Sequence, residues 1–296
     1  MRVAIHTPDD TGFPNLALMK ISAWHKNNGD TIEWFDGFTS RCIGYDKVYS
    51  SKIFTFSDED KYLPYDAILG GTGYGLMDTL SVEVDSIFPD YSIYPNVDSA
   101  IGFLTRGCPN KCSWCIVPKK EGEIKPYLSW KAVKRKDSRN IVFMDNNVLA
   151  SDWGLSNIED MGGRDLRVDF NQGLDARLIT KSVAHLLGNL FWLKPIRMAC
   201  DHKSQMPYIE QAVKYLREEH ATPKNYFCYV LVKDIDDAYE RVMFLKGLGV
   251  DPFAQPYRDF ENNIEPTKEQ KDFSRWVNHK AIFKSVAWED YKAWRC

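Results

Sequence analysis

Hydrophobic positions along the first part of the chain alternate between two spacings, which indicates strands alternating with helices. Extended or helical runs follow one another at residues 2–6, 14–26, 31–35, 47–56 and 65–69. The second of these runs has apolar side chains at helical spacing, and the other four are short and strand-like. Strands that alternate with helical segments are typical of a parallel sheet with helices on its faces. We therefore predict a small parallel α/β domain over residues 1–90.

The same order of strand and helix is repeated over residues 91–267. Strand-like runs occur at residues 100–105, 140–144, 166–171, 196–200, 226–233 and 250–255. The clearest helical spacing between them lies at residues 207–220 and 234–248. Six β/α units in succession form an incomplete parallel barrel. The pattern as a whole predicts an α/β protein, with a small Rossmann-like parallel α/β domain followed by a partial (β/α)6 TIM-type barrel.

Two segments depart from this pattern. Residues 77–96 are rich in Asp, Pro and Tyr and interrupt any regular period, so we interpret them as the linker between the domains. Residues 268–296 combine aromatic side chains with lysines. We expect this C-terminal extension to form helices that cover one end of the barrel, because aromatic residues at helical spacing are usually buried. Stacking on nucleic acid bases is the alternative for these aromatics.

Composition and charge place the chain among ordinary globular proteins. It has 296 residues, 44% of them hydrophobic, and a formal net charge of -3, which argues against a whole-protein attraction to nucleic acid or membrane. No basic and then apolar leader opens the sequence, and no run of about 18 apolar residues occurs. We expect a cytoplasmic protein without a membrane partner.

One local segment is strongly basic. Between residues 119 and 139, eight Lys and Arg residues stand against three Asp and Glu residues. Such a segment can bind phosphates, or it can be a solvated helix face.

The most specific chemical feature is the stretch 102–122, called the cysteine loop below, which reads GFLTRGCPNKCSWCIVPKKEG. Cys108, Cys112 and Cys115 stand in it at C-x3-C-x2-C spacing. Three thiolates can hold three irons of a [4Fe-4S] cube and leave the fourth iron without a protein ligand. A zinc site or a plain electron-transfer cluster needs a fourth Cys or His ligand, which the loop lacks.

The other cysteines are scattered along the chain, at Cys42, Cys200, Cys228 and Cys296. An odd total of seven, with three in one loop, is not typical of a disulfide framework. The pattern is consistent with a reducing compartment.

Cys108, Cys112 and Cys115, with Trp114 immediately before the last cysteine, resemble the signature of the radical S-adenosylmethionine superfamily. The resemblance extends along most of the chain. FPNLALMKISAWHKNNGDTIEWFD and ILGGTGYG are similar to the cobalamin-binding-type domain that precedes many barrels of this superfamily. IVFMDNNVLA, VDFNQGLDARLI and IRMACDHK are similar to the barrel of that subgroup.

This resemblance implies a [4Fe-4S] cluster and S-adenosylmethionine as cofactors. One electron from the reduced cluster would cleave S-adenosylmethionine to a 5′-deoxyadenosyl radical, which abstracts a hydrogen atom from the substrate. It also implies an electron donor such as flavodoxin or ferredoxin. The substrate is not identified; a small molecule is favoured, and nucleic acid stays open because of the basic segment.

Polar residues that follow the predicted barrel strands are the candidates for binding S-adenosylmethionine. In chain order they are Asp145, Asn147, Asn171, Gln172, Arg177 and Asp201. In α/β barrels the carboxyl ends of the strands carry the functional groups, so we expect these side chains near the cysteine loop. Arg177 suits a carboxylate partner, which can be that of the cofactor or of the neighbouring Asp175.

Two absences limit the resemblance, and one glycine-rich run has two interpretations. Cobalamin is possible but not favoured, because the D-x-H-x-x-G motif that supplies a cobalt ligand in many cobalamin domains is absent. The glycine run at residues 70–75 can be a phosphate- or cofactor-binding loop or simply a tight turn. The first domain also lacks the three further cysteines of transfer RNA methylthiotransferases.

The functional alternatives fall into different classes. One is a non-catalytic iron-sulfur protein that transfers electrons or binds a partner. The other is a cobalamin-dependent radical methyltransferase or a nucleic-acid-modifying enzyme.

Overall fold

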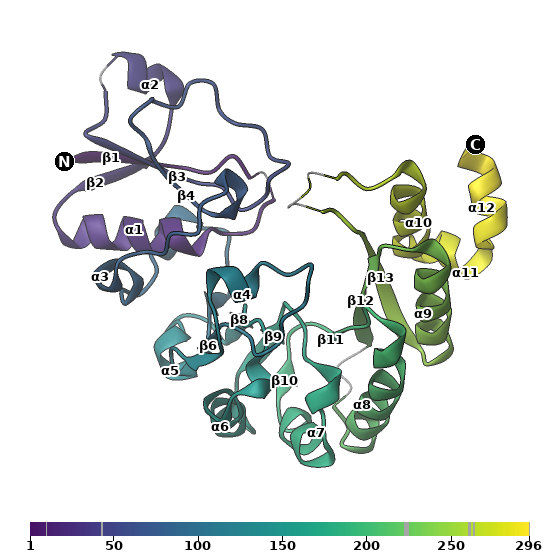
Figure 1. Ribbon diagram of the computed structural model, residues 1–296. Helices are drawn as coiled ribbons and strands as arrows, with labels where there is room; N and C mark the ends of the chain where they lie inside the picture. Colours follow the sequence, from purple (N-terminus) through teal and green to yellow (C-terminus); the bar gives the residue numbers. More distant parts are fainter. Residues whose placement is uncertain (10, 43, 222–224, 260–261, 263, 296) are drawn as a thin grey trace. The chain divides into compact units, whose positions relative to one another are not determined.

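The computed structural model describes residues 1–9, 11–42, 44–221, 225–259, 262 and 264–295, with the backbone alone at 39, 41, 42 and 293–295. It divides into two compact units, Met1–Asp98 and Ser99–Cys296 (Figure 1). The strands are β1 (Arg2–His6), β2 (Thr31–Trp34), β3 (Lys47–Ser51), β4 (Ile68–Gly70), β5 (Ala100–Gly102), β6 (Thr105–Arg106), β7 (Lys125–Pro126), β8 (Asn140–Phe143), β9 (Arg167–Phe170), β10 (Phe191–Trp192), β11 (Ile196–Ala199), β12 (Tyr226–Val232) and β13 (Val250–Pro256). The helices are α1 (Leu16–Asn27), α2 (Gly37–Cys42), α3 (Val82–Asp85), α4 (Val117–Lys120), α5 (Trp130–Val133), α6 (Asp152–Met161), α7 (Lys181–Gly188), α8 (Met206–Glu218), α9 (Ile235–Gly247), α10 (Lys268–Asn278), α11 (Lys280–Ser285) and α12 (Trp288–Arg295).

The first unit is a four-stranded parallel sheet in the order β2-β1-β3-β4. Helix α1 begins after Asn15, whose side-chain oxygen accepts a hydrogen bond from the Leu18 amide, as an N-cap residue does. Leu18 and Met19 on this helix are fully buried. The predicted parallel α/β class is confirmed for this unit.

Strand β3 is shorter than predicted. The run over residues 47–56 was expected to be extended throughout, but β3 ends at Ser51. Asp9 accepts hydrogen bonds from the amides of Ile53 and Phe54, at 2.6 and 3.3 Å, so these amides are bound to a side chain rather than to a neighbouring strand. The apolar pattern of residues 47–56 does not show that a distant carboxylate binds these amides in place of a neighbouring strand.

The segment interpreted as a linker, residues 77–96, packs on helix α1. Lys20 on α1 is buried and its Nζ lies 2.7 Å from Asp85 Oδ1. Asp90 accepts hydrogen bonds from Ser22 Oγ at 2.6 Å and from Lys26 Nζ at 2.7 Å. These contacts place the segment inside the first compact unit, which extends to Asp98.

The second unit contains two parallel sheets, in the orders β5-β8-β9-β10 and β11-β12-β13, together with the antiparallel pair β6-β7. An isolated parallel bridge between Leu174 and Met198 joins the two parallel sheets. The α/β class with parallel strands is thus confirmed here as well. The fourth predicted strand, over residues 196–200, corresponds to β11, whereas the short strand β10 before it was not predicted. Pro195, which has no amide hydrogen and cannot donate to a ladder, lies between β10 and β11.

The two faces of these sheets differ in character. Helices α6, α7, α8 and α9 lie along one face (Figure 1), where the alternating residues of β12 are buried in the hydrophobic core. Phe227 and Tyr229 point to the opposite face and are only partly buried. Their rings pack together with that of Phe253 on β13, with centroid distances of 5.1 to 6.1 Å.

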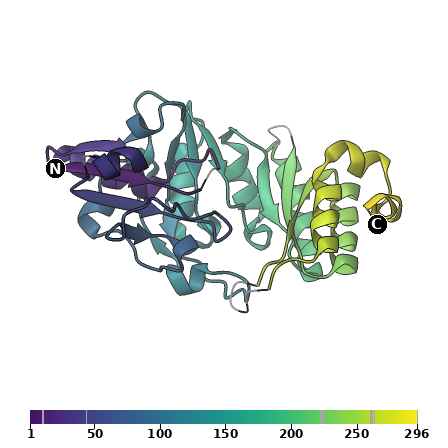
Figure 2. The same ribbon diagram turned by 90° about the horizontal axis from the view of Figure 1, so that it is seen from above.

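The C-terminal helices α10 to α12 bury most of the aromatic side chains predicted to form core. Figure 2 shows these helices (yellow) beside strands of the second unit (green). Helix α10 is attached to β13 through Asn278, whose side chain donates to the Ala254 carbonyl and accepts from its amide. The buried aromatic residues are Phe273, Trp276, Phe283, Trp288 and Tyr291. The side chain of Trp294 lies outside the described part of the chain, as do those of Cys42 and Cys296.

Within the ranges that the structure describes, no helix has both the length and the apolar character needed to cross a membrane.

The hydrogen bonds of Asp90 predict that its contribution to stability depends on pH. Burial by itself raises the pKa of this carboxyl, but hydrogen bonds from Lys26, Ser22 and Ser92 outweigh it and lower the pKa to about 2. A depressed pKa stabilises the folded state above the unfolded value of 3.8, and this contribution is lost as the pH falls toward 2. Asp90→Asn should therefore lower the melting temperature at pH 7, and the gap from the unmodified protein should narrow between pH 4 and pH 2.

Thermal denaturation followed by circular dichroism measures this gap. Asp66→Asn is the control, because Asp66 is exposed and should leave the melting temperature unchanged. A gap for Asp90→Asn that does not change with pH would contradict the prediction.

Candidate functional site at the cysteine loop

The two ends of the cysteine loop, residues 104–108 and 121–123, lie together and are called the stem below. Gly107 has φ +84°, and a Cβ there would lie 2.2 Å from the Glu123 carbonyl oxygen, so glycine is required. The Cys108 amide donates to the Gly122 carbonyl at 3.2 Å, which closes the stem.

Glu121 is the centre of the stem and was not among the predicted site residues. One of its carboxylate oxygens pairs with Arg106 at 2.6 Å. The other accepts from the Gly107 amide at 2.8 Å and from Asn146 Nδ2 at 3.0 Å. The Arg106 guanidinium also lies over the ring of Phe103, 3.9 Å from its centroid. In the sequence, Glu121 is one acidic residue in a basic run, and its position gives no signal of this role.

The three cysteines of the loop are partly buried free thiols. The Cys115 amide donates to the Cys112 carbonyl at 3.1 Å, so a tight turn joins these two residues. Burial raises the pKa of both Cys112 and Cys115, and the neighbouring thiols add to the increase. In the part of the chain that the structure describes, no three His, Cys, Asp or Glu side chains converge as a metal-binding group. The thiols are therefore near one another but are not arranged as a preformed metal site.

Asp145 holds the start of the loop. Its carboxylate is 2% exposed and accepts hydrogen bonds from the amides of Leu104 and Thr105, and from Thr105 Oγ1 at 2.7 Å. Burial raises the pKa of this carboxyl to about 6, against the effect of these hydrogen bonds. Asp145 was predicted to bind S-adenosylmethionine, but its hydrogen-bonding capacity is largely taken by Leu104 and Thr105 at the start of β6.

Asn147 connects the loop to the residues after β9. Its side-chain nitrogen lies 3.8 Å from Cys108 Sγ and donates to Asp175 Oδ2 at 3.1 Å. Asn147 is 3% exposed, and its side-chain oxygen is buried without a hydrogen-bond partner. Buried amide oxygens are rarely unpaired, so this atom, like Asn171 Oδ1, is an acceptor that a ligand could use.

Arg177 forms an ion pair with Asp175, as the alternative interpretation of this residue expected. Its Nε and NH2 lie 2.8 and 2.6 Å from the two Asp175 oxygens. Burial raises the pKa of Asp175, but Arg177 and the other hydrogen-bond donors outweigh burial and keep it below its usual value. The Arg177 side chain is 40% exposed, and its positive charge lowers the pKa of the Cys112 thiol. Arg177 thus faces the cysteines while it is paired with Asp175.

Asp201 keeps one carboxylate oxygen without a partner among the described residues. Its Oδ1 accepts from the Leu231 amide at 2.9 Å, and its own amide donates to Gln205. Burial raises the pKa of this carboxyl, and its negative charge raises the pKa values of the Cys112 and Cys115 thiols. Asp201 is therefore electrostatically coupled to the cysteine loop and has a free acceptor.

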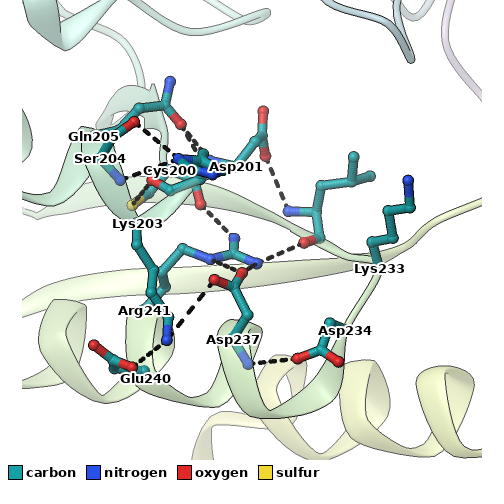
Figure 3. A network of polar contacts seen from close by, with 12 residues as sticks. Cys200, Asp201, Lys203, Ser204, Gln205, Lys233, Asp234, Asp237, Glu240 and Arg241 are labelled. Atoms are coloured by element: carbon teal, nitrogen blue, oxygen red, sulfur yellow. Dashed lines mark hydrogen bonds and ion pairs between the residues drawn. The ribbon is translucent and has the colours of Figure 1, made fainter.

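A buried arginine positions Asp201 (Figure 3). Arg241 on α9 is 1% exposed and donates to the Cys200 carbonyl at 2.6 Å and to the Leu231 carbonyl at 3.0 Å. Its charge is balanced by Asp237, whose Oδ2 lies 2.6 Å from NH2. The Arg241 guanidinium thus links Cys200, which precedes Asp201, to Leu231, whose amide donates to the Asp201 carboxylate.

The remaining predicted residues are placed differently. Gln172 is exposed. Asn171 has a buried side-chain oxygen without a partner, and its carbonyl accepts from Tyr229 Oη at 3.0 Å. Asn171 thus lies on the face of the sheet away from the helices, where Asp169 and Arg197 form an ion pair. Asp169 and Arg197 are charged residues inside otherwise apolar strands, which is a sequence signal for such a pair, but the ion pair was not predicted.

The glycine run in the first unit is a structural turn. Cβ atoms at Gly71 and Gly73 would lie 2.3 and 2.4 Å from atoms of Lys52, so the loop packs directly on that residue. The amides of Gly73, Tyr74 and Gly75 all donate to carbonyls of the turn or of Lys52. Amides that are bound in this way are not available to a phosphate.

No protein-family model matches the chain, and a comparison with curated proteins gives no match either. Any functional assignment therefore depends on the residues and geometry described above.

Asp145→Asn should destabilise the second unit by about 2 kcal/mol. The substitution replaces Oδ2, which accepts from the Leu104 amide at 3.0 Å, with an NH2 group, so that two buried donors face each other at this position. Asp201→Asn is the matched control, because asparagine retains the single oxygen that Leu231 requires, and it should cost less than about 1 kcal/mol. Urea denaturation followed by circular dichroism measures both values; equal losses would refute the assigned role of Asp145.

Arg241→Met should destabilise the second unit by about 3 kcal/mol, because it leaves two buried carbonyls and Asp237 without their partner. Arg275→Met is the comparison, since Arg275 pairs with Asp272 but is 56% exposed. Exposed pairs of this kind contribute less than about 1 kcal/mol. The same urea titration compares the two variants, and a loss for Arg241→Met no larger than that for Arg275→Met would show that the buried guanidinium is dispensable.

Proposed function

We propose that the chain is a radical S-adenosylmethionine enzyme in which Cys108, Cys112 and Cys115 bind three irons of one [4Fe-4S] cluster. The observation that carries the proposal is the C-x3-C-x2-C set of thiols on a loop whose stem is fixed by Asp145 and Glu121. Thiolates are soft ligands that select zinc or iron-sulfur clusters, and a structural zinc site needs a fourth Cys or His. The cysteine loop contains neither, so the donor set fits a three-ligand cluster.

The fold supports this assignment through the positions of the residues. In the proposed architecture the two parallel sheets of the second unit act as one wall of a partial (β/α)6 barrel. The cysteine loop, Asn147, Arg177 and Asp201 then follow successive strands on its functional end. The electrostatic coupling of Arg177 and Asp201 to the thiols is what this arrangement requires.

When bound, the reduced cluster and S-adenosylmethionine would supply an electron and a 5′-deoxyadenosyl radical for hydrogen abstraction from the substrate. The residues of the chain bind and orient these groups. The free oxygen of Asp201 suits the amino group of S-adenosylmethionine, and Arg177 suits its carboxylate. The amide of Asn147 lies against the Cys108 sulfur, and hydrogen bonds to ligand sulfurs tune the potential of such clusters.

A reductant such as flavodoxin or ferredoxin completes the proposed reaction, and the substrate is proposed to be a small molecule. Cobalamin is not part of the proposal, because the D-x-H-x-x-G motif that supplies a cobalt ligand in many cobalamin domains is absent from the sequence.

Anaerobic reconstitution with iron and sulfide tests the proposal. The reconstituted protein should contain about four irons per chain, and dithionite with S-adenosylmethionine should then yield 5′-deoxyadenosine, measured by chromatography. Cys112→Ala should lose the cluster and the product, because two thiolates cannot hold the cube. Cys228→Ala is the control, since Cys228 is a fully buried thiol outside the loop, and it should retain both.

The result also separates the alternatives. A stable cluster that never yields 5′-deoxyadenosine would support the iron-sulfur protein without catalysis and overturn the enzyme proposal. Equal loss in Cys112→Ala and Cys228→Ala would remove the cysteine loop from the proposal.

A further inference from the structure

A pocket with basic walls lies in the second unit, away from the cysteine loop. Its cavity volume is about 590 Å³. It is lined by Trp130, Lys134, Lys136, Asp137, Ser138, Arg139, Arg164, Asp165 and Leu166, and it is called the basic pocket below. These residues come from α5 and its C-cap Lys134 and from the segments that precede β8 and β9. They therefore lie at the amino ends of the strands, whereas the predicted S-adenosylmethionine contacts follow the carboxyl ends.

The floor of the basic pocket is rigidly built. Trp130 is 6% exposed, its amide donates to Asn157 Oδ1 at 2.9 Å, and its indole nitrogen donates to Asp160 Oδ2 at 2.8 Å. Leu166 is 4% exposed beside it. The Arg164 guanidinium lies 5.3 Å from the centroid of the Trp130 ring. The charged walls thus stand on an apolar floor held by hydrogen bonds.

The charges of the basic pocket are not balanced. Arg139 is paired with Asp165 at 2.8 Å, Arg164 pairs with Asp160, and Asp137 is paired with Arg135. Lys134 and Lys136 are exposed, and the described residues give neither of them an acidic partner. Four basic residues line the pocket against two acidic ones in a chain whose net charge is -3. The basic pocket is therefore positively charged, although the whole chain carries a net negative charge.

We propose that the basic pocket binds a phosphate-bearing ligand, with Lys134 and Lys136 as its principal contacts. Ammonium groups on flexible stems bind phosphates as point charges, and guanidinium groups such as that of Arg164 add planar donors. The phosphates can belong to a nucleic acid backbone or to a free diphosphate, and these two sources share the same chemistry. The site does not depend on the cysteine loop, so it can exist whether or not the proposed radical function is correct.

Binding to the full chain is measured by fluorescence anisotropy with a labelled twelve-nucleotide single-stranded RNA, and by calorimetry with inorganic pyrophosphate. The double variant Lys134→Ala/Lys136→Ala should weaken binding on the order of ten-fold at 100 mM salt. The slope of log K against log salt for the RNA should fall by about 1.4, because each phosphate neutralised on a single strand contributes about 0.7.

Lys214→Ala/Lys284→Ala is the matched control, since these lysines are exposed on α8 and α11 and change the net charge equally. Unchanged binding in the control with weakened binding in Lys134→Ala/Lys136→Ala supports the site. RNA binding alone assigns it to a nucleic acid backbone, and pyrophosphate binding assigns it to free phosphates. Absence of binding to both probes, or an equal loss in both double variants, overturns the proposal.

Discussion

The carboxylate of Asp145 is the constraint on which the candidate site depends. Asp145 is the second residue after β8, yet its carboxylate accepts hydrogen bonds from the amides of Leu104, between β5 and β6, and of Thr105, the first residue of β6. The chain reaches the cysteines only two residues beyond β6, so the position of that stem sets where the thiols begin. A displacement of Asp145 would therefore be transmitted to Cys108 through a few rigid peptide units.

Buried charges recur at the strand ends of the second unit, and each is compensated locally. Arg241 is balanced by Asp237 and uses its other donors on two carbonyls, while Asp169 is paired with Arg197 on the face away from the helices. Burial of an ion is unfavourable unless such partners are present. The strand ends are thus a region where polar groups are held in fixed directions inside an otherwise apolar unit, which is the condition that ligand binding requires.

The sequence predicted α1, α8, α9 and most strands, because the apolar spacing of these three helices is long and regular. It did not predict the edge strand β10, because a run of two residues is too short to show a strand period. The cysteines were evident from spacing alone. The role of Asp145 was not, because a sequence shows that a carboxyl follows a strand but not which amides surround it. Glu121 was missed for the same reason.

Glu121 closes the chain between residues 107 and 121 before any ligand is bound. Closing a flexible segment of this length costs about 2 kcal/mol in chain entropy. Because folding of the second unit has already met that cost, binding of the proposed cluster by the three thiols would need to order only the interior of the segment. The affinity for that cluster would then depend in part on the Glu121 carboxylate, which closes the base of the segment and is not one of the proposed ligands.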